Sequence, residues 1–254
     1  MLKIRVIPTL LYKDFGLVKG KFFNSSRRVG ALLPAIKVYN QREIDELILV
    51  DISANSRNSS IDLEMIKDIS QDCFVPLTVG GGVDSCQKVE DLLMAGADKI
   101  SLNSAAFNNP SLITDISNRF GSQCVVASID VRKENHNEWK CFSHSGTIPT
   151  NKDVVRWAKE VENRGAGEIL LSSIDNDGTM QGYDLDLIQI VCESVNIPVI
   201  ASGGAGDYKD MILAITKSGA SAVAAASIFH FTEQTPISIK LELSRAGIPV
   251  RIPF

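Results

Sequence analysis

The sequence predicts one (βα)8 barrel that spans residues 1–254 as a single domain, and three observations lead to it. Short β-branched runs alternate with amphipathic segments of helix length along the whole chain. A length of 254 residues, 44% of them hydrophobic, suits one large α/β domain. Stretches of the first half of the chain also recur in the second half at a nearly constant offset.

Eight runs are predicted to form the strands of a parallel sheet. Two of them, Leu47–Asp51 and Val75–Val79, are almost continuously apolar, which is typical of strands covered on both faces. In chain order the predicted strands are Arg5–Leu10, Leu47–Asp51, Val75–Val79, Lys99–Leu102, Cys124–Ile129, Ile169–Leu171, Val199–Ala201 and Ala222–Ala225.

Segments of helix length separate successive strands, and several open on Ser, Asn or Asp, whose side chains accept hydrogen bonds from the first turn of a helix. The polar segment from Val131 to Ser145 interrupts the alternation and carries Trp139 and Phe142, so we expect a small hairpin there. The predicted helices are Ser60–Ser70, Ser85–Ala95, Asn109–Phe120, Asn151–Arg164, Asp184–Ser194 and Asp207–Ser218.

The internal repeat favours a closed TIM barrel over an open doubly wound sheet, which is the structural alternative. Its offsets are 122 or 123 residues, so each half supplies four strands. The matching pairs are Glu46–Asp51 with Glu168–Ser173, Pro76–Gly82 with Pro198–Ala205, and Lys99–Ala105 with Ala222–Ile228.

Charge and hydropathy exclude several classes of function. The formal charge is 26 − 30 = −4, without the basic excess that nucleic-acid binding needs. The longest apolar stretch, Ala220–Phe231, is too short to cross a membrane, and Arg5 and Pro8 interrupt any secretory signal, so we expect a cytoplasmic protein. The cysteines are odd in number and widely spaced, which predicts neither a metal site nor a cofactor bound through them; they are Cys73, Cys86, Cys124, Cys141 and Cys192.

Two glycine clusters follow strands where a barrel builds its site. Gly80–Gly82 comes after the third strand and Gly203–Gly206 after the seventh. Each has a partner turn after the next strand, Asn103–Ser104 and Ala226–Ser227. Small residues let backbone N–H groups approach an anion, so the pair of clusters predicts two phosphate sites for a ligand phosphorylated at both ends. The alternative is that the glycines only make tight turns.

Four aspartates lie at or just beyond strand ends, where acid–base chemistry would take place: Asp51, Asp130, Asp175 and Asp177. Asp130 is the best placed, because it ends an apolar run and would lie partly desolvated at the barrel mouth. The alternative is an aspartate that caps a loop. The corresponding position at the end of the first strand is Leu11, which carries no carboxylate.

Four charged residues enter strands at the opposite end, the barrel floor, and their signs alternate. We expect them to form a salt-bridged ring, which on the residues alone is more simply a plug that neutralises buried charge. They are Arg5, Glu46, Lys99 and Glu168.

Ordered matches now cover essentially the whole chain and resemble the cyclase subunit of imidazole glycerol phosphate synthase, a histidine-pathway barrel that receives ammonia from a glutaminase. The matching stretches are Lys13–Asp14, Val18–Gly20, Ile44–Leu47, Thr78–Gly82, Gly96–Ile100, Asn109–Thr114, Arg164–Leu171, Asp177–Thr179, Ala201–Gly206 and Phe229–Phe231.

The resemblance assigns roles to residues of this chain. It implies that Lys19 belongs to a mobile first loop, that the floor residues Arg5, Glu46, Lys99 and Glu168 form an ammonia gate, and that Asp98 lies where the glutaminase docks. One phosphate would be held by Gly82, Asn103 and Ser104. The other would be held by Asp177, Gly178, Gly204, Ala226 and Ser227.

The chain departs from this family at one position of the acid–base pair, where Leu11 stands opposite Asp130. It most resembles a divergent branch, the glycosyl-amidation-associated proteins of surface-polysaccharide loci, in which such a barrel and a glutaminase supply ammonia to a sugar amidotransferase. Two other interpretations stay open: a working cyclase in which Asp14 or Asp51 replaces the lost carboxylate, and a sugar-phosphate isomerase of the same barrel type.

Overall fold

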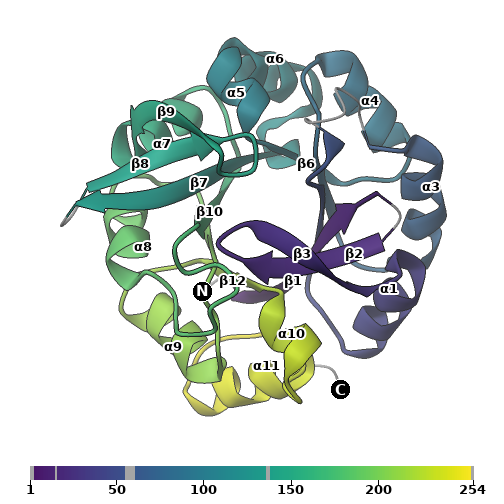
Figure 1. Cartoon of the computed structure of the whole chain (residues 1–254), viewed down its shortest axis with the longest axis vertical. Helices are drawn as coiled ribbons and strands as arrows, with labels where there is room; N and C mark the ends of the chain where they lie inside the picture. The colour runs from purple at the N-terminus through teal and green to yellow at the C-terminus, as the bar shows by residue number, and fades with distance from the viewer. Residues whose placement is uncertain (1–2, 15, 55–60, 136–137, 253–254) are drawn as a thin grey trace.

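The structure is a computed structural model that describes residues 3–14, 16–54, 61–135 and 138–252. Its eight core strands are parallel and close into the predicted (βα)8 barrel, which Figure 1 shows end on. Pairing of β12 with β1 and of β7 with β10 completes the ring. In order round the barrel the strands are β1 (Arg5–Lys13), β4 (Leu47–Asp51), β5 (Leu77–Gly80), β6 (Lys99–Leu102), β7 (Val125–Asn135), β10 (Glu168–Ser173), β11 (Val199–Ser202) and β12 (Ala222–Ala225).

Helices surround the strands on the outside, and all six predicted helices are present with shifted ends (Figure 1). None of the helices within the described ranges has the length and apolar character to span a bilayer. The outer helices are α1 (Leu32–Gln41), α3 (Leu63–Asp72), α4 (Cys86–Met94), α6 (Ser111–Phe120), α7 (Val154–Asn163), α8 (Leu185–Cys192), α9 (Tyr208–Thr216) and α11 (Pro236–Arg245). The sequence analysis did not identify α1 or α11.

Two short helices and one 3-10 turn are also present within the described ranges. Helix α5 (Ser104–Asn108) follows β6 and α10 (Ser227–Phe231) follows β12, so they occupy equivalent positions in the two halves. The 3-10 helix η1 covers Ser122–Cys124, which moves the start of β7 to Val125.

Alternation along each strand divides the core into two layers. On β7, Val126 points into the barrel, whereas Val125 and Ala127 pack outward against the helices. The same period of two places Ile7 of β1 and Leu170 of β10 inside. The barrel interior is therefore filled by a short apolar column above the floor, while a larger apolar layer joins the strands to the helices.

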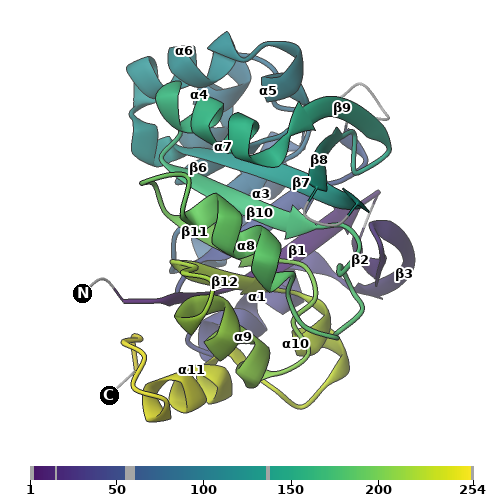
Figure 2. The ribbon, with the colours of Figure 1, turned by 90° about the vertical axis from the view of Figure 1, so that its left-hand side faces the viewer.

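Each half also carries an antiparallel hairpin after its first strand. Strands β2 (Gly16–Lys21) and β3 (Asn24–Gly30) follow β1, and β8 (Glu138–Ser143) and β9 (Ile148–Asp153) follow β7. Both hairpins lie at the same end of the barrel, which is the mouth (Figure 2). The hairpin expected over 131–145 is correct in place, but its first strand continues β7, and residues 136–137 lie outside the described ranges.

Several element boundaries differ from prediction for identifiable reasons. Strand β5 begins at Leu77, because Pro76 has no N–H to donate to a neighbouring strand. Helix α7 begins at Val154 with Asp153 as its cap, and Asn151, predicted to be helical, lies in β9 with a positive φ of 57°. The predicted start of another helix, Ser60, lies outside the described residues.

A buried ion pair joins the last helix to the barrel floor. Lys240 of α11 is 1% exposed, and its Nζ lies 2.9 Å from Asp45 Oδ1. The other carboxylate oxygen of Asp45 accepts a hydrogen bond from Val6 N at 2.9 Å. Ile4, two residues before Val6, forms a parallel bridge with Val250, so segments near the two ends of the chain pair at this end of the barrel.

Replacing Lys240 with methionine should lower the free energy of unfolding by about 3–5 kcal/mol, because it leaves Asp45 buried without its cation. The matched change Lys37→Met breaks an exposed ion pair with Asp72 and should cost less than about 1 kcal/mol. Urea unfolding followed by circular dichroism measures both variants. Equal losses in the two would contradict the role of Lys240.

Candidate functional site

A cavity opens at the mouth of the barrel, where the carboxyl ends of the strands meet. Its lining includes all four residue groups expected at the site: Asp130, Leu11, the first glycine cluster with Asn103 and Ser104, and the second cluster with Asp177, Gly178, Ala226 and Ser227. The structure thus brings the predicted mouth residues together around one space.

Asp130 is buried at the inner end of this cavity. Asn103 Nδ2 donates a hydrogen bond to Asp130 Oδ2 at 3.1 Å, and Ser128 Oγ donates to Oδ1 at 3.5 Å. Burial, followed by the nearby carboxylate of Asp177, raises the pKa of the Asp130 carboxyl to about 7, a net shift that the hydrogen bond from the Ser128 hydroxyl partly opposes. A carboxyl group that titrates near neutral pH can both accept and donate a proton.

Strand register makes Leu11 the structural equivalent of Asp130. Leu11 pairs with Val50 on β4, and Asp130 pairs with Ser172 on β10, which is 122 residues further along the chain. The two strands, β1 and β7, stand opposite each other in the eight-strand ring. Both Leu11 and Asp130 line the cavity. An alkyl side chain therefore stands opposite Asp130, at the position where the family's acid–base pair would place a second carboxylate.

Thr9 on β1 and Ser128 on β7 are a second pair of equivalent residues. Thr9 and Ser128 precede Leu11 and Asp130 by two residues, and each lines the cavity. Ser128 has a carboxylate to donate to, whereas the buried Oγ1 of Thr9 has no hydrogen-bond partner within the described ranges. A buried hydroxyl without a partner costs about 1–3 kcal/mol, so Thr9 points to a polar partner that Leu11 does not supply.

Two other aspartates that were expected at the mouth, Asp51 and Asp175, form hydrogen bonds within the protein. Asp51 lines the cavity, but its Oδ1 accepts hydrogen bonds from Ser53 N at 2.9 Å and Ser53 Oγ at 2.7 Å. Asp175 lies outside the cavity and accepts a hydrogen bond from Lys133 N at 2.8 Å. Asp175 is thus a loop-capping residue, whereas Asp51 is close enough to reach a ligand.

The two glycine clusters make the same backbone shape in both halves. A Cβ on Gly81 would lie 2.4 Å from the carbonyl oxygen of Asp51, and one on Gly203 would lie 2.6 Å from that of Ser173. Both glycines also have positive φ, at 118° and 88°. The backbone therefore requires glycine at each position, so both clusters form tight turns. Gly81 and Gly203 also line the cavity.

The turns after β6 and β12 differ in the hydrogen bonds that their serine side chains form. Ser104 Oγ accepts a hydrogen bond from His144 N at 2.9 Å and is thereby held by the second hairpin. Its equivalent Ser227 is 6% exposed, and its Oγ has no partner within the part of the chain that the structure describes. An unpartnered hydroxyl that faces a cavity is suited to a hydrogen-bonding ligand.

The first hairpin lies over the mouth and is fastened by an ion pair. Lys19 lies in β2, within the hairpin that connects β1 to α1, and its Nζ is 2.7 Å from Asp177 Oδ1. Phe22 N donates to the carbonyl of Asp177 at 2.9 Å, and Phe23 lines the cavity. Gly178 fits closely beneath the hairpin, since a Cβ there would lie 2.1 Å from the carbonyl oxygen of Gly20.

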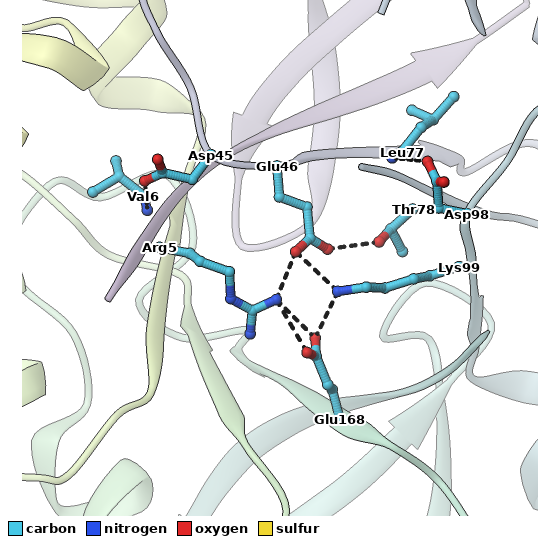
Figure 3. A network of polar contacts seen from close by, with 9 residues as sticks. All are labelled: Arg5, Val6, Asp45, Glu46, Leu77, Thr78, Asp98, Lys99 and Glu168. Atoms are coloured by element: carbon cyan, nitrogen blue, oxygen red, sulfur yellow. Dashed lines mark hydrogen bonds and ion pairs between the residues drawn. The ribbon is translucent and has the colours of Figure 1, made fainter. Parts of the chain in front are cut away.

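The four charged floor residues form the expected ring (Figure 3). Arg5 Nη1 lies 2.6 Å from Glu46 Oε2 and 3.0 Å from Glu168 Oε1, and Lys99 Nζ lies 3.0 Å and 3.2 Å from the same two carboxylates. Thr78 Oγ1 donates to Glu46 at 2.8 Å. Burial lowers the pKa of Arg5, but Glu168 and Glu46 outweigh it, so the net shift is upward.

Beside the ring, the floor presents exposed apolar side chains. Phe74, in the loop between α3 and β5, is 80% exposed, and Met94, at the end of α4, is 84% exposed. Asp98, which directly precedes β6, is exposed on the same side, and its Oδ2 accepts a hydrogen bond from Leu77 N at 2.8 Å (Figure 3). Large exposed apolar groups next to a fixed carboxylate are typical of a protein interface.

Thr9, Ser128 and Phe23 are among the mouth residues that were not predicted from the sequence. The two hydroxyl residues could have been found, because they stand two positions before Leu11 and Asp130 and so share their face of the strand. Phe23 gave no such signal, since its place depends on how the hairpin folds back over the barrel.

Comparison with known proteins shows a family match and a similar protein along nearly the whole chain. The family described as "Histidine biosynthesis protein" matches residues 5–235. The chain is 43% identical over 251 residues to a protein of Gluconacetobacter diazotrophicus named "Imidazole glycerol phosphate synthase subunit HisF", an alignment that covers 99% of this chain and 97% of the relative.

The environment of Asp130 predicts opposite shifts in two variants. Asp177→Asn removes a negative charge and should lower the pKa of Asp130 from about 7, whereas Ser128→Ala removes a donor to the carboxylate and should raise it. Asp175→Asn, outside the cavity, is the control and should change nothing. Carbon-13 NMR titration of the Asp130 carboxyl measures the three values, and shifts of the same sign would refute this description.

Proposed function

The chain belongs to the histidine biosynthesis protein family, and from that membership and the site we propose an ammonia-conducting, cyclase-like barrel subunit. A glutaminase docks at the floor and releases ammonia into the barrel. A phosphorylated ligand occupies the mouth. The ammonia then passes to a sugar amidotransferase for surface-polysaccharide biosynthesis, and cyclase turnover is impaired or lost.

The route for ammonia is supported by the order of side chains from floor to mouth. The ring of Arg5, Glu46, Lys99 and Glu168 has no net charge, and a cation that swings away from both carboxylates would open it. Above it, the interior is apolar and includes small side chains such as Ala222 and Ala224. An apolar lining suits neutral ammonia, because it disfavours the charged ammonium ion.

The ligand is supported by the two equivalent halves of the mouth. Gly82, Asn103 and Ser104 would hold one phosphate, and Gly178, Gly204, Ala226 and Ser227 the other. Asp177, whose carboxylate would repel a phosphate, already binds Lys19 at 2.7 Å, so the pair presents little net charge to the ligand.

The presence of Leu11 opposite Asp130 is the observation on which the proposed loss of cyclase activity rests. Cyclisation by the family relies on a carboxylate at both strand ends, and loss of one positioned acid–base group costs about 10²–10⁴-fold in rate. All four charged residues of the floor ring are present, whereas the acid–base pair at the mouth has only one carboxylate. This combination fits a barrel that conducts ammonia without cyclising a substrate. Asp51 is the strongest replacement for the lost group, because it lines the same cavity, and retained turnover would point to it.

Restoring the carboxylate tests this interpretation. Wild-type protein with saturating ammonium should consume the family's bisphosphorylated ribulosyl substrate at a rate at least about 10²-fold below that of Leu11→Asp. The new carboxylate would also give the Thr9 hydroxyl an acceptor, so the variant should fold normally. Absorbance or mass spectrometry of the imidazole product measures the rate, and robust wild-type turnover would overturn the proposal.

Docking of the glutaminase can be tested at the floor. Asp98→Lys and Phe74→Asp should each weaken the complex by about tenfold or more, because one reverses a charge and the other places a charge in an apolar contact. Ile148→Asp is a matched control, since Ile148 is exposed but lies on the hairpin at the mouth. Calorimetric titration gives the Kd values. Equal affinities for all variants would rule out this face.

The second phosphate site can be tested without disturbing the backbone. Ser227→Ala removes an unpartnered hydroxyl, so stability should be unchanged or slightly higher, while binding of a bisphosphorylated ligand analogue should weaken about tenfold. Calorimetry and thermal unfolding on the same samples separate the two effects. A variant that loses stability but keeps its affinity would show that Ser227 serves the fold alone.

A further inference from the structure

A second hollow lies on the outer side of the first hairpin, next to the mouth. We call it the outer groove; its lining includes Lys21, Phe22, Arg27, Met180 and Phe231. The groove and the main cavity share Lys19 and Gly178, so the two are contiguous. The role proposed above for the barrel makes no use of this groove.

The outer groove is positively charged. Lys21 and Arg27 are exposed, neither forms an ion pair within the described ranges, and the described lining contains no carboxylate. This contrasts with the net charge of −4 of the whole chain. The groove therefore attracts anions.

Two aromatic rings are held open to solvent in the same groove. Phe22 is 54% exposed and Phe231 is 40% exposed, and the Arg27 guanidinium lies 4.8 Å from the centroid of the Phe231 ring. Phe22 has a φ of 55°, a conformation that bulky side chains rarely adopt. Its N–H donates to Asp177, which fixes the turn, so the ring of Phe22 stays on the outer side.

We propose that the outer groove binds a nucleoside diphosphate. The planar base stacks on Phe22, and the phosphates bind Lys21 and Arg27, whose guanidinium is positioned by its stacking on Phe231. Exposed aromatic rings beside unpaired cations supply both interactions that such a ligand needs. This binding does not depend on ammonia transfer or on a glutaminase, so the two proposals fail independently.

The test uses a reporter inside the groove. Phe22→Trp keeps an aromatic ring at this position, and its fluorescence, measured against the wild-type background, should fall saturably on titration with adenosine diphosphate. Adenosine alone and inorganic pyrophosphate alone should each bind at least tenfold more weakly. Adding Arg27→Ala to the reporter should raise the Kd about tenfold.

Two controls locate the site. Arg119→Ala removes an exposed arginine that also stacks on a phenylalanine, but from α6 across the barrel, and should leave the Kd unchanged. Ser227→Ala in the main cavity should likewise have no effect on the reporter. Calorimetry on the wild-type chain should give a similar Kd, and Phe22→Ser should weaken it.

Three results would overturn the proposal. They are no saturable response to adenosine diphosphate, equal weakening by Arg27→Ala and Arg119→Ala, or loss of binding in Ser227→Ala, which would place the nucleotide in the main cavity. In the first case, the aromatic and basic lining would be better explained as a surface that docks an acidic protein.

Discussion

Closure of the sheet is the constraint on which the rest of the molecule depends. Once β7 pairs with β10 and β12 with β1, every second side chain of each core strand must enter the barrel. The interior then becomes a stack of layers that begins with the charged ring of Arg5, Glu46, Lys99 and Glu168 and continues through an apolar column that includes Ile7. It ends at the hydroxyls of Thr9 and Ser128 and the mouth. The fold therefore places the charged ring and the mouth at the two ends of one apolar column.

The two halves of the barrel share a backbone but have diverged in chemistry. Gly81 and Gly203 avoid the same carbonyl clash at equivalent positions, so the turns of both halves are constrained alike. The side chains facing the cavity differ: Asp130 corresponds to Leu11, and the partnered Ser104 corresponds to the unpartnered Ser227. The cavity and the floor ring are both present although one half carries an alkyl group at the position where the other half carries a carboxylate.

The strands and the charged ring could be predicted from the sequence because both depend on local pattern. Short β-branched, largely apolar runs located the eight strands, and the alternating signs of Arg5, Glu46, Lys99 and Glu168 indicated a ring. Contacts made by the hairpin over the mouth and by the last helix were beyond such reasoning. Lys19 and Phe23 reach the site only because the β2–β3 hairpin folds back on Asp177, and Lys240 reaches Asp45 from the far end of the chain. Helices α1 and α11 were missed, although α11 closes the floor side of β1.

Passage of glutamine nitrogen through the barrel is the central claim, and isotope tracing tests it most directly. The glutaminase complex would be given amide-15N glutamine in buffer containing unlabelled ammonium, with the sugar amidotransferase present, and the label in the amidated product read by mass spectrometry. The account predicts mostly labelled product from the wild type. It predicts a fall to the isotope ratio of the buffer in Ala224→Leu, which narrows the interior away from both protein interfaces. Unchanged labelling in a folded Ala224→Leu variant would contradict the route.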